Sequence, residues 1–256
     1  MITLGVDVGS LATKAVILKD NEILVFKIIT TDTEGKATKA ILDGVLAEAG
    51  LAFGELQNIV ATGIGKREAD YARDYSSEVT CDARGAACLF PEAGAIIDIG
   101  GQSCRAIRCD SKGNVVDFAL NDKCAAGTGI FLSSMAKALE VNPEEMGELS
   151  LQSTSEVNIT SMCAVFAESE VVSQIHRKVP KVDIIKGLHK SIALRIYGLA
   201  NKVGLEKQII VIGGVAKNIG VVNCLEELIK QKLSVPEEPQ IIGALGAAII
   251  ARERGI

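Results

Sequence analysis

"VDVGSLATKAVI", residues 6–17, and "IDIGGQSCRAI", residues 97–107, are two versions of one pattern spaced 91 residues apart. In each, an apolar run ends in an aspartate, Asp7 or Asp98, and a glycine turn leads into a second apolar run with a basic residue seven positions after the acid. Apolar runs joined by a tight glycine turn are typical of a β-hairpin. We therefore predict two related hairpins, and the repeat indicates a chain of two related lobes.

The remaining sequence alternates strand-like and helix-like segments, which indicates an α/β fold. We place lobe I at residues 1–92 plus about 243–256, and lobe II at residues 93–242, so that each lobe contains one hairpin. The last helical segment, residues 243–253, is rich in glycine and alanine. We expect this helix to pack closely against another element.

Charge and composition exclude several classes of partner. The net charge is −5 and no basic block occurs, which argues against a nucleic-acid partner. The first residues lack the pattern of a signal peptide, and no apolar run reaches the roughly 18 residues of a membrane span. We expect a cytoplasmic protein in which the seven cysteines serve as thiols or metal ligands and not as disulfides.

The hairpins contain the groups that bind a nucleotide's phosphates, namely close backbone amides, a hydroxyl or lysine, and a carboxylate for the metal ion. From the first hairpin we expect Asp7 to anchor Mg²⁺ through water, and the turn and return strand to meet the phosphates. The phosphate-binding candidates there are Gly9, Ser10, Thr13 and Lys14. From the second we expect Asp98, with Gln102, to orient the attacking water. Its turn adds Gly100 and Gly101.

A third segment, "IIVIGGVAKN" at residues 209–218, reads as a strand, a glycine pair and a helix start. Gly213 and Gly214 leave room for an adenosine against the backbone, with Ala216 and Lys217 in the same turn. Two other phosphate motifs do not fit. "ATGIGKR", residues 61–67, lacks the loop length and the Ser/Thr of a P-loop, and no dinucleotide-type glycine pattern follows a strand.

The paired Asp-Gly hairpins and the adenosine motif resemble the actin, Hsp70 and sugar-kinase superfamily of ATPases. The resemblance implies a two-lobed fold with duplicated, five-stranded β-sheet lobes and ATP in a nucleotide cleft between them.

Two cysteines stand directly before expected helices, Cys124 in "NDKCAAGTGIF" and Cys163 in "TSMCAVFAESE". The free amides and the dipole at a helix start favour a thiolate over a thiol. Two thiolates do not complete an iron–sulfur cluster, which usually takes four, but a twofold dimer would supply the other pair. Taken alone, each cysteine is equally well explained as a buried small hydrophobe. We expect packing roles for the other cysteines and solvated surface positions for His176 and His189.

The cysteine segments, the hairpins and "GGVAKN" together resemble the 2-hydroxyacyl-CoA dehydratase activators of the BadF/BadG/BcrA/BcrD ATPase family. The resemblance implies a homodimer with one bridging [4Fe-4S] cluster, ligated by Cys124 and Cys163 of each subunit. ATP hydrolysis to ADP would then drive one low-potential electron into a partner Fe-S metalloenzyme, with ferredoxin or flavodoxin as the upstream donor.

The same resemblance places Gly127 and Gly129 between the cluster and the ATP cleft. The partner would be a 2-hydroxyacyl-CoA dehydratase, an aryl-CoA reductase or a double-cubane-cluster protein. The chain departs from the family pattern at Ser103, where related activators commonly carry an acid after Gly-Gly-Gln.

Two other functions stay open from the residues. A small-molecule kinase of the same superfamily, for example an amino-sugar kinase, would need a polar substrate pocket and no cluster. A nucleotide-binding sensor without catalysis would show no ATP turnover with any partner, although an aspartate in each hairpin argues against it.

Overall fold

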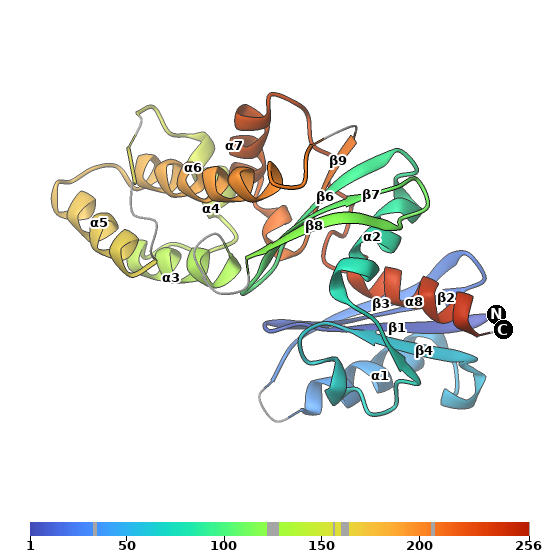
Figure 1. The fold of residues 1–256 in the computed structure, drawn as a ribbon. Coiled ribbons are helices and arrows are strands. Elements are labelled where there is room, and N and C mark those ends of the chain that lie inside the picture. Colours follow the sequence, from blue (N-terminus) through green and yellow to red (C-terminus); the bar gives the residue numbers. More distant parts are fainter. Residues whose placement is uncertain (33–34, 122–127, 156, 160–163, 206–207, 256) are drawn as a thin grey trace. The chain divides into compact units, whose positions relative to one another are not determined.

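The computed structural model describes residues 1–32, 35–121, 128–155, 157–159, 164–205 and 208–255 (Figure 1). The strands in these ranges are β1 Ile2–Val8, β2 Ala12–Lys19, β3 Glu22–Thr30, β4 Asn58–Thr62, β5 Asp74–Tyr75, β6 Ala93–Ile99, β7 Cys104–Cys109, β8 Val115–Asn121 and β9 Gln208–Ile212. The α-helices are α1 Lys36–Ala49, α2 Glu78–Leu89, α3 Gly129–Leu139, α4 Met146–Leu151, α5 Ala164–His176, α6 Lys181–Ala200, α7 Ile219–Ile229 and α8 Ile242–Arg254. Short 3-10 helices lie at Phe53–Glu55, Lys66–Glu68 and Gly214–Lys217. None of the helices in the described ranges is long and apolar enough to span a membrane.

The first sheet has the strand order β3-β2-β1-β4-β5. Strand β1 pairs antiparallel with β2 and parallel with β4. The hairpin predicted from the first glycine turn is therefore present, and its register sets Asp7 directly opposite Lys14. Parallel pairing of β1 with β4 requires a crossover, which α1 provides.

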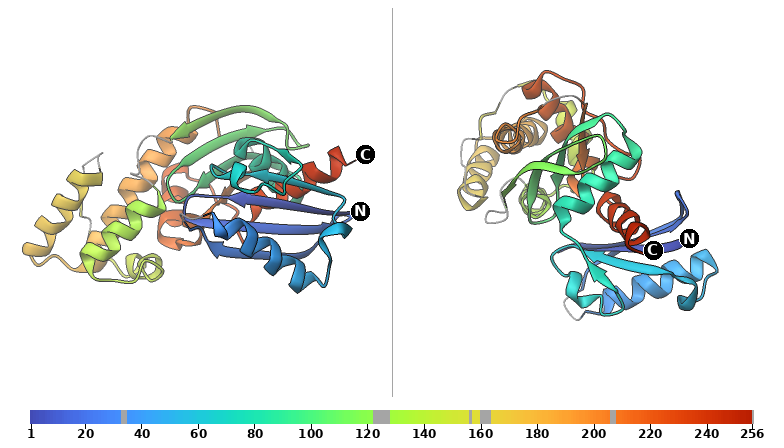
Figure 2. Two further views of the ribbon diagram at one scale, coloured as in Figure 1. Left: turned by 90° about the horizontal axis from the view of Figure 1, so that it is seen from below. Right: turned by 45° about the vertical axis from the view of Figure 1, so that its right-hand side comes forward.

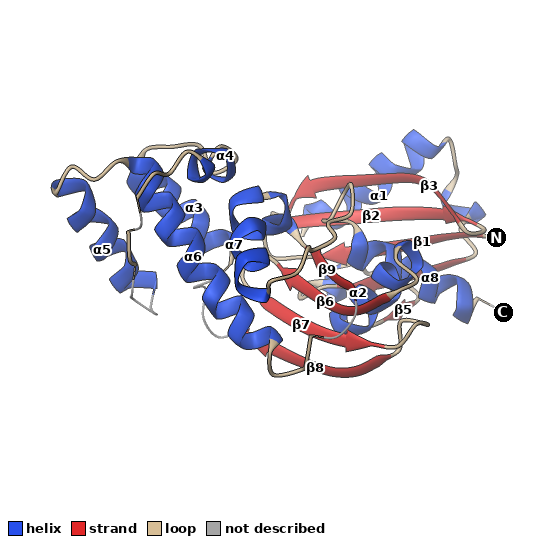
Figure 3. Ribbon diagram, turned by 90° about the horizontal axis from the view of Figure 1, so that it is seen from above, coloured by secondary structure: helices blue, strands red, loops and turns tan. Residues whose placement is uncertain are grey.

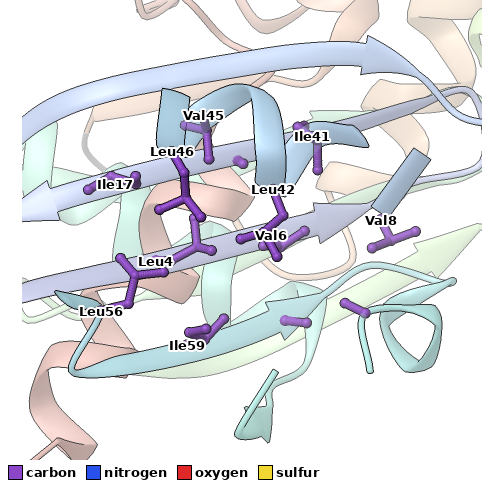
Figure 4. Packing of buried hydrophobic residues seen from close by; sticks show 13 residues of the cluster. Leu4, Val6, Val8, Ile17, Ile41, Leu42, Val45, Leu46, Leu56 and Ile59 are labelled. Atoms are coloured by element: carbon purple, nitrogen blue, oxygen red, sulfur yellow. The ribbon is translucent and has the colours of Figure 1, made fainter. Parts of the chain in front are cut away.

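The central strands of the first sheet are buried on both faces, and for this reason β2 is apolar along most of its length. Ala15 and Ile17 face the core under α1, together with Leu4 and Val45 (Figure 4). Alternate residues of β2 point to the other face, where they pack with α8. Figure 2 shows α1 and α8 on opposite sides of this sheet.

Helix α8 packs against its neighbours at backbone distance, as its small residues predicted. A Cβ atom added to Gly5 on β1 would lie under 3.0 Å from α8 backbone atoms, and the same holds for Gly85 on α2. On α8 itself, a Cβ at Gly246 would meet the Cys81 carbonyl oxygen equally closely. Side chains at these three positions would force the elements apart.

The second sheet has the order β8-β7-β6-β9, which repeats the order β3-β2-β1-β4 of the first sheet. The five strands implied by the family resemblance are reduced in the described residues to four strands and a single parallel bridge between Ile210 and Ser234. Pro236 follows two residues after this bridge. Because proline lacks an N–H donor, it prevents the pairing from extending into a fifth strand.

By its internal contacts the chain divides into two compact units. Unit 1 comprises Met1–Ile96, Ile107–Asp117 and Pro236–Ile256, and unit 2 comprises Ile97–Ala106 and Phe118–Val235. Within unit 2, α6 packs against α4 and α7, and α3 packs against α5 (Figure 3). The lobe boundaries expected from the sequence stay a prediction.

Candidate functional site

The first hairpin holds an ion pair across its two strands. Lys14 Nζ lies 2.8 Å from Asp7 Oδ2, and both side chains are 15% exposed. The turn below them is closed by a hydrogen bond from Gly9 N to Ala12 O of 3.1 Å. The lysine expected to meet a phosphate thus bonds to the neighbouring carboxylate in this structure, and its phosphate contact stays a prediction.

The hydroxyl of Thr13 supports the same turn from below. Thr13 is fully buried, and its Oγ1 lies 2.9 Å from Thr31 Oγ1. Thr31 Oγ1 in turn donates to the Gly9 carbonyl at 2.8 Å. Ser10, at the tip of the turn, is half-buried. The threonine pair fixes the Gly9 peptide, whereas a phosphate contact by Thr13 stays a prediction.

A glycine at the end of β4 packs against the first aspartate, and the sequence analysis missed it. Gly63 has φ of 92°, which a side chain rarely adopts, and a Cβ there would lie 2.6 Å from Asp7 Oδ1. It belongs to the segment that was rejected as a P-loop. The feature of the sequence that could have indicated it is its place directly after an apolar strand, which in the structure is β4 and lies parallel to β1.

A second carboxylate lies in the same part of unit 1. Asp82 on α2 is 5% exposed. A Cβ on Gly243, in the first turn of α8, would lie 3.1 Å from Asp82 Oδ1 and 3.5 Å from Asp7 Oδ2. The neighbouring Cys81 has its pKa raised to about 12 by burial, with Asp82 and Asp7 adding to the effect. Cys81 is therefore a protonated, structural thiol, as expected.

The second hairpin repeats the ion pair, with an arginine in place of the lysine. Asp98 at the end of β6 is 6% exposed and pairs with Arg105 on β7, which is 9% exposed. The turn is closed from Gly100 N to Ser103 O at 2.9 Å, the counterpart of the Gly9 bond. Arg105 Nη2 also donates to Ser103 Oγ at 3.0 Å.

The second aspartate, like the first, has a glycine of positive φ packed against it. Gly213, after β9, has φ of 87°. A Cβ there would lie 2.5 Å from the Ile99 carbonyl oxygen and closer still to Asp98 Oδ1. Each unit thus builds the same arrangement from an acid, a base and a left-handed glycine. Only the acid and the base share the 91-residue spacing that the sequence reveals.

Helix α3 is joined to the second turn by its first two amides. Gly129 N donates to Gly100 O at 3.0 Å, and Ile130 N donates to Gly101 O at 2.9 Å. The start of this helix therefore follows the position of the turn. Gln102, beside these carbonyls, is exposed. Gly127, Cys124 and Cys163 lie outside the described residues.

The expected adenosine segment forms a 3-10 turn between β9 and α7. Ala216 N donates to Gly213 O at 3.2 Å, Ala216 is buried, and Gly214 and Lys217 are exposed. Asn218 then caps α7 by accepting a hydrogen bond from Val221 N at 3.1 Å.

The expectation that His189 is solvated is wrong. The side chain is fully buried on α6, and its Nε2 lies 3.2 Å from Asn218 Nδ2. Burial is the main cause that lowers its pKa to about 3, and the charge of Lys186 adds to it. The lysines beside it in the sequence, Lys186 and Lys190, are half-buried. His189 is therefore a neutral residue that contacts Asn218, the last residue of the segment expected to bind adenosine.

The remaining cysteines are mostly packed, as expected. Cys104, Cys109 and Cys224 are buried, and desolvation raises the pKa of each thiol. Cys88, at the end of α2, is exposed, so the expected packing role is wrong for this cysteine. The ligand role of Cys124 and Cys163, which lie outside the described residues, stays a prediction.

Comparison with known proteins gives a full-length match. The BadF/BadG/BcrA/BcrD ATPase family matches residues 4–251. The activator of lactoyl-CoA dehydratase from Anaerotignum propionicum is 47% identical over 99% of this chain and 98% of its own length.

Solved structures agree with this match. Component A of the (R)-2-hydroxyglutaryl-CoA dehydratase from Acidaminococcus fermentans has a TM-score of 0.97 at 42% identity, over 100% of this chain and 99% of that one. The 2-hydroxyisocaproyl-CoA dehydratase activator from Clostridium difficile with bound ADPNP has a TM-score of 0.95 at 40% identity, over 100% and 96%.

A more distant likeness concerns the fold alone. A ROK family glucokinase from Streptomyces griseus matches with a TM-score of 0.61 at 15% identity, over 99% of this chain and 100% of that one. The expected actin-like and sugar-kinase-like ATPase fold is confirmed, with two mixed sheets and helices packed on them.

Proposed function

The chain belongs to the BadF/BadG/BcrA/BcrD ATPase family, and from this premise we propose that it is an ATP-dependent activator that transfers a low-potential electron to a partner metalloenzyme. The observation that carries the proposal is the pair of acid-bearing hairpins in a chain that resembles dehydratase activators over its whole length. The related activator with bound ADPNP supports ATP as the nucleotide.

On the hydrolysis side, we assign Asp7 to the magnesium ion and Asp98 to the attacking water. Mg²⁺ prefers oxygen donors and keeps several of its waters, and the Asp7 carboxylate, 15% exposed beside Lys14, suits binding through those waters. Gln102 would assist Asp98 from its exposed place in the turn. Positioning and charge neutralisation suffice for phosphoryl transfer, so no covalent intermediate is needed.

On the electron side, we assign Cys124 and Cys163 as ligands of one [4Fe-4S] cluster shared by a homodimer. When bound, the cluster would accept and donate one electron at a time. Helix α5 begins at Ala164, directly after Cys163, and a helix start favours a thiolate. Helix α3 begins at Gly129, five residues after Cys124, and α3 packs against α5.

We propose that the start of α3 connects the nucleotide site with the cluster site. Its first amides bond to the Gly100 and Gly101 carbonyls, in the turn that follows Asp98. A change in this turn when the nucleotide is hydrolysed would therefore move the start of α3. Movement there would alter the donors and solvent around Cys124, which are among the properties that set a cluster potential.

The partner follows from the relatives' chemistry. We propose a 2-hydroxyacyl-CoA dehydratase as the electron acceptor, in line with the name of the Anaerotignum propionicum relative. An aryl-CoA reductase or a double-cubane-cluster protein is an alternative acceptor of the same low-potential electron. Ferredoxin or flavodoxin would supply the electron.

Anaerobic purification tests the proposal. We expect a brown protein with about one cluster per dimer, which loses its colour in Cys124→Ser and Cys163→Ser but keeps its affinity for ADP. Cys224→Ser, a change of the same kind at a packed cysteine, is the control and should keep the colour. A colourless anaerobic preparation that still hydrolyses ATP would contradict the cluster, and phosphorylation of a sugar by that preparation would favour the kinase alternative.

A further inference from the structure

The two ion pairs of the duplicated hairpins differ in the base. Lys14 carries its charge on one nitrogen, which pairs with Asp7. Arg105 has a planar guanidinium whose nitrogens point in fixed directions. One nitrogen, Nη1, bonds to Asp98 Oδ2, and the other, Nη2, donates to Ser103 Oγ at 3.0 Å.

These contacts fix both the arginine and the acid. The hydroxyl of Ser103 lies in the turn whose ends are held by the bond from Gly100 N. Because Ser103 holds one end of the guanidinium, the other end has a defined direction toward Asp98. On the opposite side of the carboxylate, Gly213 approaches Oδ1 so closely that no side chain would fit. Asp98 is thus held between a cation and a backbone.

Burial makes the arginine important for the charge of the acid. Asp98 is 6% exposed, and a carboxylate removed from water stays ionised only with a compensating partner. Arg105 pairs with Asp98, and the nearby thiol of Cys104, whose pKa is raised by burial, is neutral. Arg105 supplies a positive charge directly at this carboxylate.

We propose that Arg105, oriented by Ser103, is a positioning residue that keeps Asp98 ionised and correctly directed toward the attacking water. This inference rests on the proposed ATPase function. It also gives Ser103 a role. An acid at that position would share the guanidinium with Asp98, whereas the neutral hydroxyl orients Arg105 and leaves its charge to Asp98.

The first test compares Arg105→Gln and Arg105→Lys in steady-state ATP hydrolysis as a function of pH. For Arg105→Gln we expect kcat to fall on the order of 10- to 100-fold while KM for ATP changes less than about threefold. The acid limb of the kcat profile should move up by about one pH unit or more, because Asp98 loses its cation. Arg105→Lys keeps the charge and should restore most of the acid limb.

The second test uses Ser103. Ser103→Asp should move the acid limb to higher pH, since two carboxylates then compete for Arg105, whereas Ser103→Ala should lower kcat without moving the limb. Arg177→Gln makes the same chemical change at an exposed position after α5 and is the matched control.

The outcomes separate the two proposals. Wild-type protein without ATPase activity contradicts the proposed function. An active wild type whose Arg105→Gln and Ser103→Asp variants keep its kcat and its acid limb contradicts the positioning role. Thermal melts identify folded variants. Should Arg105→Gln not fold, Arg105→Lys and Ser103→Asp decide the question by the same pH profile.

Discussion

His189 Nε2 lies 3.2 Å from Asn218 Nδ2, so a buried imidazole accepts a hydrogen bond from the residue that caps α7. The acceptor must be unprotonated, which places the ring proton on Nδ1. Among the residues that the structure describes, Nδ1 has no hydrogen-bond partner. The arrangement therefore requires a neutral ring.

This requirement predicts a loss of stability in acid. The pKa of His189 is lowered from 6.5 to about 3 by burial, so the unfolded chain binds the proton first. Stability from the neutral ring is complete above about pH 6.5 and falls as the pH drops toward 3. The loss should be about 1 kcal/mol between pH 6.5 and 5.5. Urea unfolding at both pH values measures it.

His189→Gln retains an acceptor for Asn218 but does not titrate, so it should lack this pH-dependent loss. His176→Gln, at an exposed histidine, is the control and should keep it. An equal loss in wild type and His189→Gln would contradict the assignment.

Gly213→Ala should harm both stability and hydrolysis. The new Cβ would displace the Asp98 carboxylate in addition to straining the positive φ. Gly204 has a similar φ of 82°, and no atom of the described residues lies within 4 Å of a Cβ there, so Gly204→Ala isolates the backbone strain of about 1–2 kcal/mol. We expect Gly213→Ala to lose more than this in urea unfolding, and to lose ATPase activity that Gly204→Ala keeps. Equal effects would show that crowding of Asp98 is unimportant.

Two helical glycines should respond to alanine in opposite directions. At Gly246 a Cβ would overlap the Cys81 carbonyl oxygen, and overpacking of this kind costs about 1–3 kcal/mol. At Gly198 on α6 an added Cβ would have no atom of the described part of the chain within 4 Å, so alanine should stabilise the helix by about 0.5–1 kcal/mol. Thermal melts of the two variants check the prediction, and a stabilised Gly246→Ala would contradict the close packing of α8.

The threonine pair of the first hairpin should be energetically coupled. Thr31→Val removes the donor to the Gly9 carbonyl and the partner of Thr13 Oγ1, at a cost of about 1 kcal/mol or more. A double-mutant cycle with Thr13→Val, measured by urea unfolding, should give a non-zero interaction energy. Strict additivity would mean that the two hydroxyls act independently.

Local pattern predicted the hairpins well because alternation and glycine turns act over a few residues. The pairing of Asp7 with Lys14 follows directly from that register. Neighbours distant in sequence were not predictable. Gly63 reaches Asp7 only because β4 lies parallel to β1, and no local pattern encodes that pairing.

The prediction that His189 is exposed was wrong for a related reason. Charged residues near it on α6 suggested an exposed face, but the burial of a helical position depends on which side meets α4 and α7. Gly220 on α7 lies against its ring, at a distance in sequence that helical periodicity does not reveal. The ligand segments at Cys124 and Cys163 remain predictions from sequence.

The contacts of α8 also bear on the order of synthesis. The first sheet is made from residues near the start of the chain, yet one of its faces is covered by a helix that ends at Arg254. A nascent chain must therefore carry Val16 and Leu18 uncovered until the residues of α8 have left the ribosome. Cooperative completion of unit 1 therefore waits for the synthesis of α8, and until then this apolar face of the sheet is exposed to solvent and to other proteins.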